Sequence, residues 1–261
     1  MNHKKKDKLV KWLIGIVLLV IGAVYNYYRQ PEEVTGMEIP VVKGEQQGQL
    51  ICHTGHTLSY NSRTRTPQWV AWELTKAETQ GDEERSTEFL PDPKVIGIPV
   101  ETYDYSRSGY DRGHMAPAGD MKWDRQAMQE SFYLSNICPQ DHNLNNGDWN
   151  DLEIKTREWT RRYGKAYIVC GPVYREGESI EYIGTHRVAV PHAFFKAILL
   201  YQAENPVVMG FYFENKAGHR RLQDRLVSID ELETLTGMDF FSLLPDEVEN
   251  RIESEVVERL P

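Results

Sequence analysis

Residues 110 to 117 read Tyr-Asp-Arg-Gly-His-Met-Ala-Pro, and this stretch indicates both the chemistry of the chain and the fold that carries it. Arg112 and His114 flank Gly113, which lets a large ligand approach the backbone. A guanidinium group is a planar, permanently charged donor to phosphate oxygens, whereas imidazole can accept a proton near physiological pH. The pair indicates chemistry on a phosphate. Taken alone, the same spacing is also typical of an ordinary surface histidine.

A second polar block follows shortly downstream. It comprises Ser135-Asn136-Ile137-Cys138-Pro139-Gln140 and then Asn145, Trp149, Glu153 and Arg157. The last four residues recur every four positions, so they form one slowly rotating stripe if a helix begins near Asn145. An alternative remains open, in which Trp149 packs in the core while Glu153 and Arg157 form a surface ion pair worth about 0.2–0.5 kcal/mol.

Together the two blocks resemble the DNA/RNA non-specific endonucleases, which belong to the ββα-metal (His-Me finger) nucleases. The resemblance continues through residues 169–174 and 190–196 and covers roughly residues 50–250. It implies an α+β fold with a mixed, largely antiparallel sheet core, flanking helices and a ββα-metal motif. The chain itself lacks regular βαβ alternation, which also favours the α+β class.

The resemblance implies a role for each residue of the two blocks. His114 is the general base, and Asn145 is the single direct protein ligand of a divalent cation, Mg²⁺ or alternatively Mn²⁺. Such sparse ligation suits Mg²⁺, which usually keeps several waters. Glu153 holds metal-bound waters, and Arg157 orients Glu153 or meets phosphate.

Three further residues complete the predicted site. Arg112 and, in a looser motif, Arg85 bind the phosphate. Asn136 supports the catalytic geometry, although a purely structural role in holding its loop is nearly as well supported. Asp111 is expected to brace the loop rather than to touch the metal.

The implied activity is Mg²⁺-dependent endonucleolytic hydrolysis of DNA and RNA that leaves 5′-phosphate ends. Every predicted group addresses the phosphate, which is identical at each step, so little sequence preference is expected. Two alternatives remain open: a non-catalytic nucleic-acid binding or uptake protein on the same fold, and a narrower phosphodiesterase. The sequence does not show the biological role, nor whether an inhibitor protein or a homodimer controls the activity.

Residues 9–28 form an apolar run preceded by Lys4, Lys5, Lys6 and Lys8. The uninterrupted part from Trp12 to Val24 is short against the ~20 residues that span a bilayer. Because no clear cleavage site follows, we predict an uncleaved transmembrane helix that holds the nuclease domain outside the cytoplasm, periplasmic or extracellular. A cleaved signal, which would give a secreted protein, is the alternative. The predicted organisation is an anchor over 1–30, a linker over 31–49 and a nuclease domain over 50–261.

Composition narrows the remaining choices. The net charge of −9 argues against general electrostatic binding of nucleic acid over the whole surface, so positive charge is expected in one cleft. Three cysteines cannot all pair within one molecule. A zinc site is disfavoured because the spacing of the candidate ligands lacks the paired pattern of structural sites. Those candidates are Cys52, His53, His56, Cys138 and His142.

Local patterns predict the main elements. Strands are expected over 69–74 and 167–172, and a paired set over 188–201 and 206–213. Helices are expected over 124–133, 230–237 and 245–257, the second capped at its start and closed by glycine. The polar stretch 81–93 is expected to be a loop.

Overall fold

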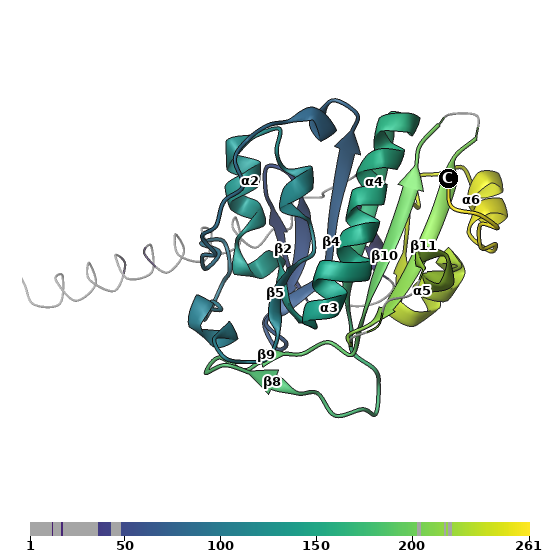
Figure 1. Cartoon of the computed structure of the whole chain (residues 1–261). Helices are drawn as coiled ribbons and strands as arrows, with labels where there is room; N and C mark the ends of the chain where they lie inside the picture. Colours follow the sequence, from purple (N-terminus) through teal and green to yellow (C-terminus); the bar gives the residue numbers. More distant parts are fainter. Residues whose placement is uncertain are drawn as a thin grey trace, which may run out of the picture. The chain divides into compact units, whose positions relative to one another are not determined.

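The computed structural model describes residues 12, 17, 36–42, 48–202, 205–216, 218 and 221–261 (Figure 1). The chain separates into two compact units, residues 1–35 and 36–261, and the second is described below. The predicted membrane helix over 9–28 lies outside the described residues except for Trp12 and Val17. Within the described part of the chain, no helix is long and apolar enough to cross a membrane.

A seven-stranded antiparallel sheet forms the centre of the second unit, in the order β12-β11-β10-β7-β4-β3-β2. Its strands are β2 (Gln49–Cys52), β3 (Thr57–Asn61), β4 (Thr66–Thr75), β7 (Lys165–Val173), β10 (Ala193–Leu200), β11 (Val207–Glu214) and β12 (Leu226–Val227). The expected α+β class with a large antiparallel sheet is therefore confirmed. The strands expected over 69–74 and 167–172 lie within β4 and β7, and β10 pairs with β11.

Three two-stranded pairs accompany the sheet. They are β1 (Val41–Val42) with β13 (Met238–Asp239), β5 (Asp111–His114) with β6 (Ile137–Gln140), and β8 (Tyr182–Ile183) with β9 (Val188–Ala189). Strand β1 falls inside the linker predicted over 31–49, whose bounds stay a prediction. Short helical turns lie at η1 (Glu78–Gln80), η2 (Thr102–Tyr105), η3 (Ala118–Asp120), η4 (Leu134–Asn136) and η6 (Leu222–Arg225).

Strand β10 explains how the sheet separates two cores. Side chains alternate between the faces of a strand, so Phe194 and Ile198 pack on one side while Phe195 and Leu199 pack on the other. The first side is covered by α4 (Asn150–Tyr163), which lies along the sheet in Figure 1. The second side packs against α5 (Ile229–Thr236) and residues 240–241.

The helix ends follow local sequence signals. Asp124 caps α2 (Arg125–Ser131) by accepting hydrogen bonds from the backbone N–H groups of residues 126 and 127. Ser228 and Glu231 form a capping box on α5, which ends at Gly237 with φ of 69°. Helix α6 (Asp246–Ile252) is shorter than the 245–257 expected. The carbonyl of Glu253, the residue after α6, accepts a hydrogen bond from the N–H of Ile229 and so caps the first turn of α5.

Candidate active site

Strand β5, which pairs with β6, holds Arg112 and His114 on either side of Gly113. Gly113 lies opposite Cys138 in this strand pair. A Cβ on Gly113 would lie 2.6 Å from Cβ of the fully buried Gln140. The glycine therefore makes room for the neighbouring strand, whereas the sequence suggested room for a ligand. Close packing of the two strands fixes where the arginine and the histidine leave the backbone.

His114 is buried, with 8% of its surface exposed, between two phenylalanine rings. Its ring centroid lies 4.7 Å from Phe132 and 5.3 Å from Phe89. Nε2 is buried and has no hydrogen-bond partner in the part of the chain that the structure describes. Burial, followed by the charges of Arg85 and Arg112, lowers the pKa of His114 to about 3. The imidazole is therefore neutral at physiological pH and can accept a proton.

Both predicted phosphate-binding arginines rest on these same rings. The Cζ atom of Arg112 lies 4.4 Å from the centroid of Phe89, and that of Arg85 lies 5.2 Å from the centroid of Phe132. Neither guanidinium forms an ion pair with a described residue. An aromatic face supports the flat side of a guanidinium and leaves its N–H edge available. The structure thus brings Arg85, Arg112 and His114 together.

The helix expected to begin near Asn145 is interrupted. A short helix, α3 (His142–Leu144), leads into a wider turn, η5 (Asn145–Trp149), and only then into α4. Gly147 breaks the helical path with φ of −108° and ψ of −113°. Glu153 and Arg157 therefore share α4, whereas Asn145 precedes it on the wide turn. Such wide turns occur frequently at functional sites.

Asn145 is held by Asp111. Its Nδ2 donates to Oδ2 of Asp111 at 2.9 Å, and Nδ1 of His142 lies 3.0 Å from the same oxygen. Oδ1 of Asn145 accepts no hydrogen bond from the described residues. A neutral amide oxygen of this kind suits Mg²⁺. Asp111 thus orients the candidate metal ligand, in keeping with the bracing role expected for it.

Glu153 and Arg157 do not form the surface ion pair considered as the alternative. Nη1 of Arg157 instead donates to the buried Asp120 at 2.7 Å. Burial raises the pKa of Glu153 to about 7, while the charge of Lys196 acts in the opposite direction. Arg157 is therefore held by an ion pair within the protein and is not available to a phosphate. With a pKa of about 7, Glu153 can be protonated or ionised near neutral pH.

Lys196 is a residue that the site analysis of the sequence missed. It is only 1% exposed, and its Nζ lies 4.0 Å from the ring centroid of Trp149 and 5.8 Å from that of Trp72. Nε1 of Trp149 in turn donates to the carbonyl of His114 at 3.2 Å, so this core tryptophan also anchors the end of β5. A lone lysine within the apolar strand 193–200 was the available signal.

The side-chain amide of Asn136 forms hydrogen bonds with the backbone. Its Oδ1 accepts from the N–H of Ala116 at 2.9 Å, and its Nδ2 donates to the carbonyls of Ala116 and Ser131 at 2.9 and 2.8 Å. These bonds fix the segment that follows His114. The geometry agrees with a supporting role through the loop, and contact of Asn136 with substrate stays a prediction.

Comparison with known proteins covers most of the chain. A family model described as DNA/RNA non-specific endonuclease matches residues 33–247. The chain belongs to this family. The nuclease is 37% identical over 238 residues to "Nuclease EXOG, mitochondrial" of Danio rerio, covering 84% of this chain and 69% of the relative. It is 36% identical over 205 residues to "Endonuclease G, mitochondrial" of Homo sapiens, covering 74% of this chain and 69% of the relative.

This chain matches a smaller share of some other relatives. The human nuclease EXOG is 39% identical over 206 residues, which make up 73% of this chain and 56% of that protein. A crystal structure of the EndoG/EndoGI complex, concerned with the mechanism of EndoG inhibition, superposes with a TM-score of 0.72 at 31% identity. That match covers 78% of this chain and 89% of the other. The nuclease therefore shares both sequence and fold with this group.

The predicted location outside the cytoplasm on a membrane anchor is wrong. The similar proteins are named mitochondrial nucleases in animals and in yeasts. No membrane-spanning helix occurs among the residues that the structure describes. Lysines followed by an apolar run occur in several kinds of N-terminal segment, so composition did not distinguish an anchor from other targeting sequences.

Two of the histidines considered for zinc contact carboxylates. Nε2 of His53 lies 3.0 Å from Asp92, and His142 contacts Asp111. Cys138 is buried and free. Across the described ranges, the one group of three His, Cys, Asp or Glu side chains close enough to share an ion is Asp230, Glu233 and Glu253. That group lies on α5 and just after α6, and not on the β5–β6 strand pair or α4.

Proposed function

We propose that this nuclease hydrolyses phosphodiester bonds of DNA and RNA without sequence preference, in an Mg²⁺-dependent reaction with His114 as the general base. The observation that carries the proposal is a neutral, buried histidine between two arginines that have no acidic partner among the described residues. The arginines suit the phosphate, and the histidine suits removal of a proton from the attacking water.

Substrate binding would strengthen the base. Burial lowers the pKa of His114 most in the free protein, and the positive charges of Arg85 and Arg112 lower it further. A bound phosphate offsets those charges, and the pKa of His114 then rises. The imidazole becomes more basic when a phosphodiester is in place, while it stays neutral in the free enzyme.

Asn145 and Glu153 fit a divalent cation. Asn145 would hold it through Oδ1, because Nδ2 is bonded to Asp111, and Glu153 would accept hydrogen bonds from its waters. When bound, the cation supplies positive charge that stabilises the developing charge on the phosphate. Arg157 keeps Asp120 neutralised beside Glu153, which limits the repulsion between the two acids.

Incubation of the full chain with circular DNA and with RNA, with Mg²⁺ or with EDTA, tests this function. We expect cleavage of both polymers in Mg²⁺ and none in EDTA, and Mn²⁺ in place of Mg²⁺ tests the alternative metal. Binding without cleavage would indicate the non-catalytic binding protein instead. Hydrolysis of a dinucleotide or a small phosphodiester, without cleavage of a plasmid, would indicate the narrower phosphodiesterase.

A further inference from the structure

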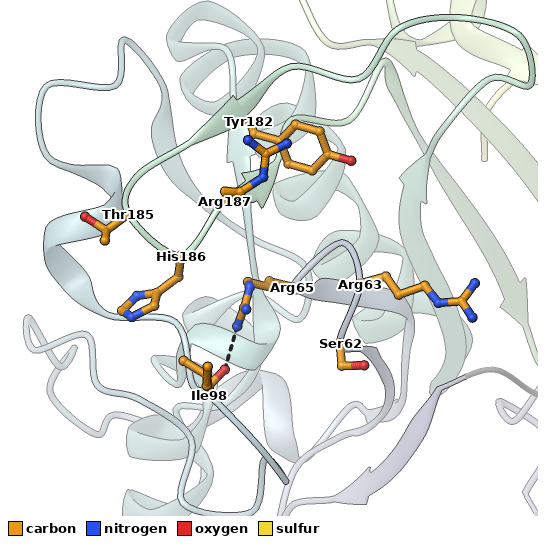
Figure 2. Close-up of a pocket in the computed structure, with 8 residues that line it drawn as sticks. All are labelled: Ser62, Arg63, Arg65, Ile98, Tyr182, Thr185, His186 and Arg187. Atoms are coloured by element: carbon orange, nitrogen blue, oxygen red, sulfur yellow. Dashed lines mark hydrogen bonds between the residues drawn. The ribbon is translucent and has the colours of Figure 1, made fainter.

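A second basic site lies apart from His114, in a cavity of about 400 Å³ between two turns (Figure 2). One turn joins β3 to β4 and carries Arg63 and Arg65, and the other joins β8 to β9 and carries His186 and Arg187. The N–H of Ala189 donates to the carbonyl of Thr64 at 2.9 Å, which ties the second turn to the first. None of the described residues that line the cavity is acidic.

The three arginines of this cavity share one feature with the active-site pair. None forms an ion pair with a described residue. Cζ of Arg187 lies 4.3 Å from the ring centroid of Tyr182, which Figure 2 shows as a seat for the guanidinium. Nη1 of Arg65 donates to the carbonyl of Ile98 at 2.8 Å, the dashed line in Figure 2. Two of the three guanidinium groups are therefore oriented while most of their donors stay available.

Two of the three arginines have a strained backbone conformation. Arg65 and Arg187 have φ of 57° and 54°, in the left-handed region that residues with a side chain rarely adopt. Strained positions of this kind concentrate at sites that bind ligands. These three arginines, which form no ion pair with a described residue, belong to a chain with a net charge of −9.

Short contacts connect the cavity to the active site. Phe89, which lies against His114, accepts a hydrogen bond at its carbonyl from Oγ1 of Thr102 at 2.9 Å. Thr102 begins η2, and Asp104 in the same turn contacts Nδ1 of His186 at 2.8 Å. Asp104 is buried behind the histidine and supports it, so its charge does not line the cavity.

We propose that the rim of this cavity, Arg63, Arg65 and Arg187 above all, binds phosphates of the nucleic-acid backbone other than the one that is cleaved. The inference rests on the proposed function, since a polyanion must occupy the active site. Arginine forks match phosphate oxygens in geometry and charge. The site would increase affinity for long substrates, and a dinucleotide would be too short to use it.

Binding is best measured in the full chain carrying His114→Ala, which separates affinity from cleavage. Fluorescence anisotropy with a labelled DNA duplex over a range of salt concentrations gives the number of phosphate contacts. Adding Arg63→Ala and Arg187→Ala should weaken binding roughly threefold to tenfold and flatten the salt dependence by about 0.9 per lost contact. Arg161→Ala, which removes an equally exposed arginine from α4, is the matched control and should change neither quantity.

Unchanged affinity and salt slope in the double variant would overturn the proposal, as would an equal loss in Arg161→Ala. If the double variant unfolds, the single change Arg63→Gln gives the same test at an exposed position, with half the expected change in slope. With His114 intact, the pocket variants should retain wild-type turnover of a dinucleotide while KM for plasmid rises. Failure of the wild-type chain to cleave any nucleic acid would overturn the proposed function, and the binding measurement would still report on the cavity.

Discussion

The two faces of the central sheet use the same strands for opposite purposes. On the α4 face, β10 contributes Lys196 to a buried group that includes Asp120 and the partly buried Glu153. On the α5 face, β10 contributes Phe195, whose ring lies 5.6 Å from Phe240. Buried charges are costly unless they are well compensated. The α4 face thus retains charges that chemistry can use, while the α5 face supplies stability.

The sharpest test of this division is Phe195→Ala, for which we expect the largest effect. The side chain is fully buried, so its loss should lower the free energy of unfolding by about 3–5 kcal/mol. Turnover of the folded fraction should stay at the wild-type value, because no predicted site residue lies on that face. Urea unfolding and initial rates measured at low temperature check both parts. A large fall in the turnover of fully folded protein would mean that the two faces are coupled.

The converse variant is His114→Ala. Removing a general base should reduce turnover by at least ~10²-fold, equivalent to about 2.7 kcal/mol in the barrier. The ring packs between two phenylalanines, so some stability will be lost as well. His114→Gln serves as a partner that keeps more of the volume. Near-normal turnover in either folded variant would remove His114 from its assigned role.

Asn145→Ala tests the metal side of the α4 face. With its amide oxygen lost, the Mg²⁺ concentration needed for half-maximal activity should rise roughly 10- to 100-fold. Glu153→Gln should raise it less, because it would act through bound water. Asn143→Ala, on the exposed side of α3, is the matched control. Wild-type Mg²⁺ dependence in both site variants would place the metal elsewhere.

The sequence predicted the parts of this site that are local. Arg112 and His114 lie on one strand, and Glu153 and Arg157 lie on one helix, so spacing alone relates them. The kink at Gly147 falls within the stripe predicted from Asn145 to Arg157, and Asn145 on the wide turn donates a hydrogen bond to Asp111, 34 residues earlier in the chain.

Long-range pairs could not be predicted in the same way. Arg157 meets Asp120 across 37 residues, and the basic cavity joins turns near residues 63 and 187. Neither pairing leaves a signal in local periodicity, because each forms only when the sheet brings distant segments together. The predicted location outside the cytoplasm was wrong for a different reason. Lysines followed by an apolar run occur in more than one kind of N-terminal segment, so the composition did not decide between them.

The smallest expected effect, and the most specific, is that of Lys196→Met, which keeps the length of the side chain and removes the charge. Lys196 opposes the rise in the pKa of Glu153 to about 7, so its loss should move that pKa higher. If the ionised carboxylate is the active form, turnover increases as pH rises through the pKa. The variant should therefore lose roughly fivefold at neutral pH for one unit of pKa shift and recover at higher pH. Removing one charge from a buried group leaves its acidic partners Glu153 and Asp120 less well compensated, so the free energy of unfolding should fall as well, and turnover is measured on the folded protein. Lys155→Met, at an exposed position on α4, should leave the pH profile unchanged. A uniform loss of turnover at every pH would show instead that Lys196 acts through packing alone, and the contrast between the two faces would then lie in shape rather than in charge.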